Sequence, residues 1–372
     1  MKFKAERATL LKALAHIQSV AEKRNTIPIL ANALIVAKGG TLSFTATDME
    51  IAIVEEVAAN VSRDGATTAP AATLYEIVRK LPEGAEIEIE MATEGAQLTL
   101  RAGRYSTSLV TLPIDDFPSM TTGQLPHRFQ LSGLALRGLI DRTRFAISTE
   151  ETRYYLNGIY LHAAEGDTML RAVATDGHRL ARVEEPIPDG AAGMPGVIIP
   201  RKTVAELRKL LDEESGEVEV GLSDTRIQFK AGPITLTSKL IDGTFPEYER
   251  VIPKDNDKVL RVGKKDFSDA VARVAAISSE RSRPVKMALD RDVLTLSAAS
   301  PEQGTASEEL DGDRVQYSAG PLEIGFQARY LNDITDQISD HVEFHFSDGS
   351  APTIVRDASD SSALYVLMPM RV

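Results

Sequence analysis

The densest group of polar side chains in the sequence is the run from Thr175 to Arg179, directly after a strand-like stretch. Within it, Asp176 and His178 could serve a hydrolase, with the imidazole as general base and the carboxylate as the group that orients it. No G-x-S-x-G motif supplies a nucleophilic serine, and the two side chains lie close together in sequence. Asp and Gly are frequent turn residues, so Asp176 and Gly177 favour a structural turn over a catalytic pair.

Metal and nucleotide sites have little support. The six histidines are His16, His127, His162, His178, His341 and His345. The last two have the i, i+4 spacing of zinc ligands on a helix, but HVEFHF alternates like a strand, where that spacing separates them by about 13 Å. The chain has no Cys and no GxxxxGK(S/T) or GxGxxG loop. We therefore expect no catalytic residues, no metal and no cofactor.

Two further stretches have the composition of binding surfaces. Arg153, Tyr154 and Tyr155 place a cation beside two aromatic rings, a combination that can hold a sugar–phosphate backbone and stack bases. Tyr155 and Leu156 could equally be core residues of a strand. The C-terminal YVLMPMRV is apolar and rich in methionine, which suits a groove that accepts varied peptides, or a last strand that closes a core.

These candidates lie in a chain that repeats itself about every 128 residues. The matching pairs are LSFTATD ending at Asp48 with LRAVATD ending at Asp176, Phe117-Pro118 with Phe245-Pro246, and LTLRAG ending at Gly103 with IQFKAG ending at Gly232. A fainter third copy contains LTLSAAS from Leu294 and VEFHFSD from Val342. A period of this length predicts three similar domains in tandem.

Each copy predicts the same elements: a short strand, a helix, alternating strands, a second helix and an antiparallel hairpin. The apolar positions of the first helices are Leu10, Leu11, Leu14 and Ile17; Leu136, Leu139, Ile140 and Phe145; and Phe267, Val271, Val274 and Ile277. The second helices are expected at 72–81, 200–211 and 328–339, and one hairpin pairs 86–91 with 97–102. The fold class is α+β, with two helices and two small antiparallel sheets per domain.

The 372 residues contain 42 Lys+Arg and 54 Asp+Glu, a formal net charge of −12. The expected helical windows 6–24, 72–81, 132–146, 200–211, 264–283 and 328–339 carry +9 in total, which leaves −21 for the strands and loops. This split could reflect helix propensity alone. It could also place the helices of all three domains on one surface that faces a polyanion.

The composition also bears on location. No stretch approaches 18 consecutive apolar residues, and charges run throughout the N-terminal segment. We therefore expect no transmembrane helix, no signal peptide and a cytoplasmic protein.

Several long motifs in order resemble one family over the whole chain, the bacterial DNA polymerase III beta subunit or sliding clamp. They are TIPILAN from Thr26, RYYLNGIY from Arg153, VATDGHRLA from Val173, VIIPRK from Val197 and SKLIDGTFPEYERVIP from Ser238. The resemblance implies three clamp domains (1–122, 123–254 and 255–372) and a head-to-tail dimer that closes into a ring around duplex DNA. It implies a non-enzymatic processivity factor for DNA replication, associated with the nucleoid.

The resemblance also implies partners and binding residues. Expected partners are a second copy, double-stranded DNA without sequence preference, the polymerase III alpha subunit, the clamp-loader delta subunit, translesion polymerases and mismatch-repair proteins. Positions matching the family's peptide pocket are Leu156, Thr175, Gly177, His178, Arg179, Leu180, Pro246, Arg250, Val251, Tyr330, Val366, Met368, Pro369, Met370 and Arg371. Gln327 and Ser350–Pro352 depart from the familiar pattern. DNA-facing positions are Arg24, Arg153, Tyr154, Tyr155 and Lys202.

Ring closure needs two different faces. We expect a strand of the first domain over 97–112 to carry Arg101 and Arg104, with little acid near them. The third domain offers Glu302, Glu308 and Glu309 together with the apolar pair Ala276 and Ile277. Two rival interpretations stay open: a hydrolase that uses Asp176 and His178, and a peptide-binding scaffold that does not bind DNA.

Overall fold

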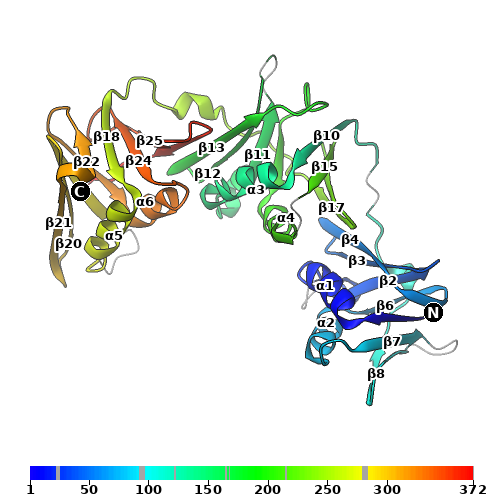
Figure 1. The fold of residues 1–372 in the computed structure, drawn as a ribbon. Helices are drawn as coiled ribbons and strands as arrows, with labels where there is room; N and C mark the ends of the chain where they lie inside the picture. Colours follow the sequence, from blue (N-terminus) through cyan, green and yellow to red (C-terminus); the bar gives the residue numbers. More distant parts are fainter. Residues whose placement is uncertain are drawn as a thin grey trace. The chain divides into compact units, whose positions relative to one another are not determined.

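The computed structural model describes residues 1–21, 26–91, 97–120, 123–163, 166, 168–213, 216–278 and 284–371. The chain forms two compact units (Figure 1). Unit 1 consists of residues 1–137, 188–195 and 202–240, and unit 2 of residues 138–187, 196–201 and 241–372. Each unit therefore contains one end of the chain and part of the central repeat. The expected three-domain limits stay a prediction.

Six α-helices occur in the described residues, two in each repeat. They are α1 (Arg7–Ile17), α2 (Ala71–Lys80), α3 (Gly133–Asp141), α4 (Arg201–Glu213), α5 (Lys264–Ala275) and α6 (Ala328–Thr335). The apolar stripes are buried as predicted at Leu10, Leu14 and Ile17 of α1 and at Phe267, Val271 and Val274 of α5. Two expectations were wrong: Phe145 lies in the separate 3-10 helix η3 (Arg144–Ala146), and Ile277 follows the end of α5.

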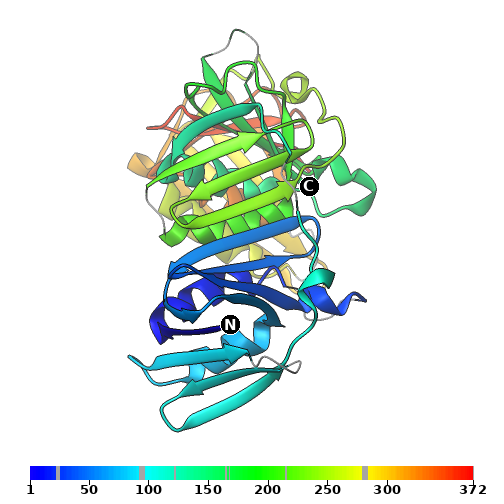
Figure 2. The ribbon, with the colours of Figure 1, turned by 90° about the vertical axis from the view of Figure 1, so that its right-hand side faces the viewer.

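Unit 1 contains two antiparallel sheets. The five-stranded sheet has the order β5 (Asn60–Arg63), β1 (Lys2–Glu6), β7 (Glu86–Met91), β8 (Gln97–Ala102) and β9 (Tyr105–Val110). The eight-stranded sheet has the order β10 (His127–Ser132), β15 (Glu217–Leu222), β16 (Arg226–Ala231), β17 (Ile234–Lys239), β4 (Ile51–Ala58), β3 (Thr41–Thr47), β2 (Asn32–Lys38) and β6 (Gly65–Pro70). Figure 2 shows the green strands of the central repeat continuing into the blue strands of the first.

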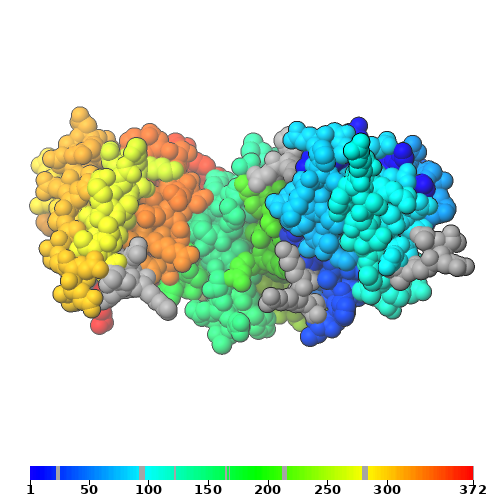
Figure 3. All heavy atoms as spheres, turned by 90° about the horizontal axis from the view of Figure 1, so that it is seen from below, coloured from blue at the N-terminus to red at the C-terminus, as the bar shows by residue number. Residues whose placement is uncertain are grey.

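Unit 2 also contains two sheets. The nine-stranded sheet has the order β14 (Val197–Pro200), β11 (Gly158–Ala163), β12 (Met169–Thr175), β13 (Arg179–Pro186), β26 (Ala363–Leu367), β25 (Thr353–Asp357), β24 (His341–Phe346), β18 (Lys258–Gly263) and β22 (Val315–Tyr317). The four-stranded sheet has the order β21 (Gly304–Asp311), β20 (Val293–Ser300), β19 (Pro284–Asp290) and β23 (Leu322–Gln327). In Figure 3 the yellow and orange atoms of these C-terminal elements gather in one body.

Neighbouring repeats are joined by one strand pairing in each unit. In unit 1, β17 pairs with β4, and in unit 2, β13 pairs with β26. Because each junction continues a hydrogen-bonded ladder, the backbone groups at these strand edges are satisfied across the repeat boundary. The last strand of the chain is therefore a structural partner of the central repeat.

The repeat extends to the way in which helices are terminated. Arg7, the first residue of α1, donates to the carbonyls of Val78 and Arg79 at the end of α2 at 3.1 and 2.7 Å. Lys264, the first residue of α5, donates to the Ile338 carbonyl beyond α6 at 2.6 Å. A cation at this position satisfies carbonyls that a helix end leaves without an intrahelical donor.

Other predicted elements were confirmed or corrected. The pairing of 86–91 with 97–102 is observed as β7 with β8, and HVEFHF is the strand β24. The expected single strand 97–112 is instead β8 and β9, joined by a turn at Gly103 and Arg104. The helix expected over 328–339 ends at Thr335. No helix among the described residues is long and apolar enough to cross a membrane.

Candidate functional site

The turn from Thr175 to Arg179, between β12 and β13, is closed by side chains. Asp176 Oδ1 accepts hydrogen bonds from the backbone N–H groups of His178 and Arg179 at 2.9 and 3.1 Å. Gly177 has a φ of +88° and donates its N–H to Thr175 Oγ1 at 3.1 Å. The predicted structural turn is confirmed, because Asp176 directs its second oxygen to Arg179 Nε at 3.1 Å rather than to the imidazole.

Arg179 is a buried cation, 5% exposed, that contacts three separate elements. Its guanidinium binds the Asp333 carboxylate of α6 and donates to the Phe145 carbonyl of η3 at 2.6 Å. It lies 4.4 Å from the Tyr330 ring centroid and 5.1 Å from that of Phe145. A buried charge of this kind needs all of its partners. Arg179 therefore joins β13 of the central repeat to α6 of the third.

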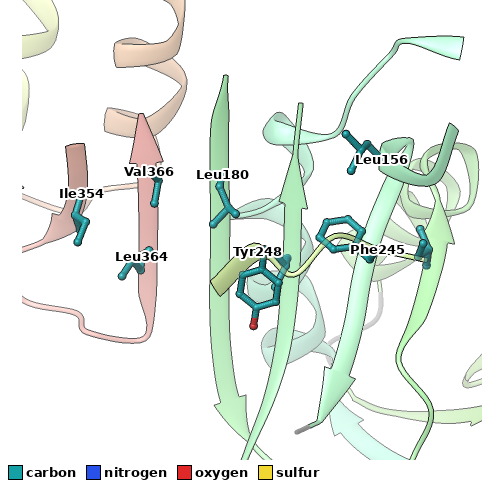
Figure 4. Close-up of a cluster of buried hydrophobic side chains, with 9 residues drawn as sticks. Leu156, Leu180, Phe245, Tyr248, Ile354, Leu364 and Val366 are labelled. Carbon is teal, nitrogen blue, oxygen red and sulfur yellow. The ribbon is translucent and has the colours of Figure 1, made fainter. Parts of the chain in front are cut away.

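Beside this turn lies a cavity of about 310 Å³, hereafter the tail cavity. Its floor belongs to a buried apolar cluster that includes Leu156, Leu180, Tyr248 and Val366 (Figure 4). Val251 and Met368 at its lining are 52% and 41% exposed, so apolar side chains are available to an incoming ligand. The full lining is Arg153, Tyr155, Leu156, Thr175, Gly177, Arg179, Leu180, Pro246, Glu247, Tyr248, Val251, Val366 and Met368.

The C-terminal segment is held in place on both sides. β26 pairs with β13, and beyond it the Met368 N–H donates to the His178 carbonyl at 2.9 Å. The Met370 N–H then donates to the Gly325 carbonyl of β23 at 2.8 Å. Because its backbone is bonded to two sheets, the methionine-rich segment forms a fixed wall of the tail cavity rather than a free tail.

The structure brings most of the expected pocket residues together. Those that line the tail cavity are Leu156, Thr175, Gly177, Arg179, Leu180, Pro246, Val251, Val366 and Met368. Those outside its lining are His178, Arg250, Tyr330, Pro369, Met370 and Arg371. His178 and Tyr330 stack on each other with centroids 6.1 Å apart, and Arg250 pairs with Glu247.

Four lining residues were missed as cavity residues: Arg153, Tyr155, Glu247 and Tyr248. Glu247 and Tyr248 follow the repeated Phe245-Pro246 pair, which was a usable signal. Arg153 and Tyr155 were assigned to DNA instead. In the structure Arg153 donates to both Glu150 oxygens at 2.8 and 2.7 Å, and this pairing holds the pKa of the Glu150 carboxyl below its usual value.

The remaining expected DNA contacts are spread over the chain. Arg24 lies outside the described residues. Tyr154 is 53% exposed on the 3-10 helix η4 (Glu151–Leu156), while Tyr155 and Leu156 on the same helix line the tail cavity. Lys202 of α4 is bound to the Asp48 carboxylate. A short helix thus divides its side chains between solvent and cavity.

The expected dimer residues lie on two sheet edges or close to them. β9 and β21 are outer strands of the five-stranded and four-stranded sheets, and Arg104, Glu302 and Glu309 are exposed. Ala276 is exposed and Ile277 is half-buried after α5.

The expectation of little acid near Arg101 was wrong. Its guanidinium lies 3.5 Å from Glu88 and 3.8 Å from Glu90, because neighbouring strands bring these side chains onto one face. Glu308 likewise accepts two hydrogen bonds from Arg273 of α5, at 2.8 and 2.6 Å. Both charges therefore have partners inside their own sheet or domain.

Among the described residues, no group of three or more His, Asp or Glu side chains could hold a metal ion. Asp176 and His178 also lack the side-chain contact that a hydrolytic pair requires. The geometry of this region is that of an apolar cavity with a fixed backbone, and it favours binding over catalysis.

Comparisons with known proteins agree along the whole chain. Models of the DNA polymerase III beta subunit match its N-terminal domain at residues 1–121, its central domain at 130–247 and its C-terminal domain at 249–371. The Beta sliding clamps of Caulobacter vibrioides (strain NA1000 / CB15N) and Escherichia coli (strain K12) are 51% and 41% identical, over 100% of each chain.

Solved structures match as closely. A DnaN sliding clamp from Bartonella birtlesii bound to griselimycin is 47% identical with a TM-score of 0.96, and one from Pseudomonas aeruginosa bound to griselimycin is 39% identical with a TM-score of 0.95. Each comparison covers 100% of both chains. The chain therefore belongs to the DNA polymerase III beta subunit family, the bacterial sliding clamps.

Proposed function

We propose that this sliding clamp tethers its protein partners through the tail cavity, which takes apolar side chains from short segments of those partners. The carrying observation is the combination of buried Leu156, Leu180 and Val366 with exposed Val251 and Met368 at one cavity. Burying one leucine or phenylalanine anchor there is worth about 1.5–3 kcal/mol. The C-terminal wall of the cavity is already fixed by backbone hydrogen bonds. Binding therefore loses little free energy to ordering this segment.

Because every proposed partner would use the tail cavity, partners compete for it. The expected competitors are the polymerase III alpha subunit, the clamp-loader delta subunit, translesion polymerases and mismatch-repair proteins. None of them requires chemistry from the clamp, so we propose a non-catalytic accessory role close to the nucleoid. Exchange of partners then depends on their local concentration and their affinity for the same site.

We propose that two copies close head to tail by joining β9 of one to β21 of the other. Both strands are sheet edges with unpaired backbone groups, which can be satisfied by strand addition. Val110 on β9 is 65% exposed, and Ile277, just after the end of α5, is half-buried. Of the expected charges, Arg104, Glu302 and Glu309 are exposed and suit the rim.

Helix charges suit weak contact with duplex DNA. Several cations are paired within the chain: Lys202 with Asp48, Lys209 with Glu206, Lys265 with Asp269 and Arg273 with Glu308. Paired cations attract phosphates less than free ones do, and a ring retains DNA by topology. Low phosphate affinity would let the ring slide.

The ring is tested on nicked circular DNA. The clamp, loaded by its loader, should remain on the circle through gel filtration and be lost when a restriction enzyme linearises the DNA. Ile277→Asp should load poorly and sediment as a folded monomer, because it buries an unpaired carboxylate in the interface. Retention that survives linearisation, or a dimer as tight as the parent's for Ile277→Asp, would contradict the proposal.

The cavity is tested separately by titrating a synthetic peptide with adjacent leucine and phenylalanine residues. Val251→Asp should weaken binding at least tenfold, because it places a charge where an apolar anchor is buried. Val259→Asp is the matched control, since Val259 is also exposed but lies on β18 outside the lining. Equal affinities of the two variants would exclude the tail cavity as the site.

A further inference from the structure

A second and larger cavity lies in unit 2, and of its lining only Pro246 and Arg250 are among the expected pocket positions. It has a volume of about 860 Å³ and is formed by Tyr160 and His162 of β11 together with the segment 245–255. It shares the lining residues Pro246, Glu247 and Tyr248 with the tail cavity. The segment 246–248 is therefore a wall common to both cavities. We call it the linker cavity, because 252–255 lead from the central repeat to the third.

The floor of the linker cavity is a preformed set of aromatic rings. The Tyr160 ring lies between His162, at a centroid distance of 4.6 Å and 22°, and Phe245, at 4.8 Å and 7°. Tyr248 meets His162 edge-on and shares a 3.0 Å hydrogen bond between its hydroxyl and His162 Nε2. Burial raises the pKa of Tyr248 to about 12, so the phenol stays neutral. Phe245 and Tyr248 are 7% and 5% exposed, so the half-buried Tyr160 and His162 are the rings that a flat, polarisable or cationic group can contact.

Neighbouring residues hold these rings in position. A Cβ at Gly196 would lie 2.2 Å from the Tyr160 hydroxyl, so glycine is required for the ring to reach this place. His162 lies opposite Arg171 in the β11–β12 ladder, and Arg171 donates to Glu184 of β13 at 2.6 Å. Arg171 and Glu184 beneath the floor therefore neutralise each other. The charges at the rim of the linker cavity determine whether it prefers a cationic or an anionic ligand.

The rim carries an excess of carboxylate. Glu247 and Arg250 pair with each other. Within the part of the chain that the structure describes, Glu249 and Asp255 have no ion-pair partner, and Lys254 is the remaining cation of the lining. Two carboxylates against one cation, above aromatic rings, match a guanidinium, which can stack on a ring and donate hydrogen bonds to carboxylates at its edge.

We propose that the linker cavity is a second subsite that binds a basic side chain, arginine above all, from the flank of a partner segment whose apolar anchors occupy the tail cavity. This inference rests on the proposed peptide-binding function and refines it. Because the two cavities share a wall, one continuous peptide can fill both. The subsite would distinguish partners by the charge next to their anchors, while the anchors supply most of the affinity.

The test uses the full chain and three synthetic peptides that share a leucine–phenylalanine core. One is unflanked, one carries arginines at both ends and one carries glutamates at both ends. On the parent protein the arginine-flanked peptide should bind about three- to tenfold more tightly than the glutamate-flanked one at low salt. In Glu249→Lys/Asp255→Lys this preference should fall below twofold. The control Glu217→Lys/Asp224→Lys, which changes net charge equally at exposed positions of unit 1, should keep it.

Three results would overturn the inference. Flanks of either charge could bind the parent equally, or the preference could survive in Glu249→Lys/Asp255→Lys, or the control could lose it as well, which would indicate a general charge effect. Each leaves binding of the unflanked peptide, and so the proposed function, intact. Failure of the unflanked peptide to bind the parent would instead overturn the proposed function and the subsite with it.

Discussion

Two turns, one repeat apart, share their backbone bonds and differ in their side chains. In both, a Thr hydroxyl donates to the carbonyl four residues on, Thr47 to Ile51 at 2.8 Å and Thr175 to Arg179 at 2.7 Å. In both, an Asp accepts two successive backbone N–H groups, at 2.8 and 2.7 Å for Asp48 and at 2.9 and 3.1 Å for Asp176. Each turn leads into the strand that joins its repeat to the next.

The third residue of each turn has a left-handed backbone. It is Met49 in unit 1, with φ of +74°, and Gly177 in unit 2, with φ of +88°. A Cβ at Gly177 would lie 2.6 Å from Arg153 Nη1, so glycine is what allows the guanidinium to lie along the tail cavity. Met49 is exposed and carries the strain that a side chain incurs in this region.

The charged groups are arranged differently as well. The fifth residue of the turn at Asp48 is the apolar Ile51, which offers no cation. The cation that binds Asp48 is Lys202 of the helix α4. Asp176 is bound by Arg179, the fifth residue of its own turn. The position equivalent to Lys202, one repeat later, is Tyr330, and its ring covers the Arg179 guanidinium. In unit 1 the cation comes from a helix and forms an ion pair with the turn. In unit 2 the cation belongs to the turn itself, and its side chain lines the tail cavity.

Arg179→Met should have the largest effect. It copies the apolar character of Ile51 and removes the buried cation from Asp176 and Asp333, of which Asp333 keeps Arg329 at 3.5 Å. Removing one partner of a buried pair costs about 3–5 kcal/mol, and partial exposure of both carboxylates places the loss near the lower end. Chemical denaturation should show a lower midpoint, and peptide binding should be lost. A stability change below about 1 kcal/mol would mean that Arg179 does not connect the repeats.

Gly177→Met should weaken binding of the leucine–phenylalanine peptide at least tenfold. The new side chain displaces Arg153 and narrows the tail cavity, and the left-handed backbone adds a strain of about 1 kcal/mol or more. The converse change, Met49→Gly, is the control and should leave peptide affinity unchanged. Isothermal titration measures both, and unchanged affinity in Gly177→Met would mean that glycine is not needed at the cavity.

Deletion of Met368 to Val372 should weaken the same peptide about tenfold or more without dissociating the dimer. The deletion removes the wall that Met368 contributes and its bond to the His178 carbonyl. The corresponding bond at the turn containing Met49 runs from the Lys239 N–H to the Glu50 carbonyl at 2.9 Å and is untouched by the deletion. Peptide titration and sedimentation of the truncated protein check both parts. Undiminished affinity would exclude the C-terminal segment as a cavity wall.

Lys202→Met should have the smallest effect, a loss of about 1 kcal/mol in unfolding free energy, because the ammonium is exposed although the Asp48 side chain that loses it is 5% exposed. Asp48 keeps its two backbone N–H donors, and Lys202 is partly exposed. The same variant should lower DNA affinity little, because the ammonium is already paired. A loss comparable to that of Arg179→Met would erase the distinction drawn between the two turns.

Much of the fold could be predicted from the sequence. The 128-residue repeat, the apolar stripes of the helices, the pairing of 86–91 with 97–102 and the turn at Asp176 all follow from local patterns. Local patterns suffice here because helix periodicity, strand alternation and Asx turns involve residues close together in the chain. The long motifs also identify the family, because they occur in order over the whole chain.

The tertiary structure decided which side chains meet across the chain. Only the packed sheets show that Arg101 lies beside Glu88 and that Glu308 is paired with Arg273. Only they place Arg153 on the tail cavity, and Tyr160 with the segment 245–255 around a second one. Composition and spacing could not reveal these contacts, because each joins residues from different elements whose approach depends on strand order and register. Sequence alone thus determined the repeating scaffold, and packing decided where that scaffold opens to a ligand.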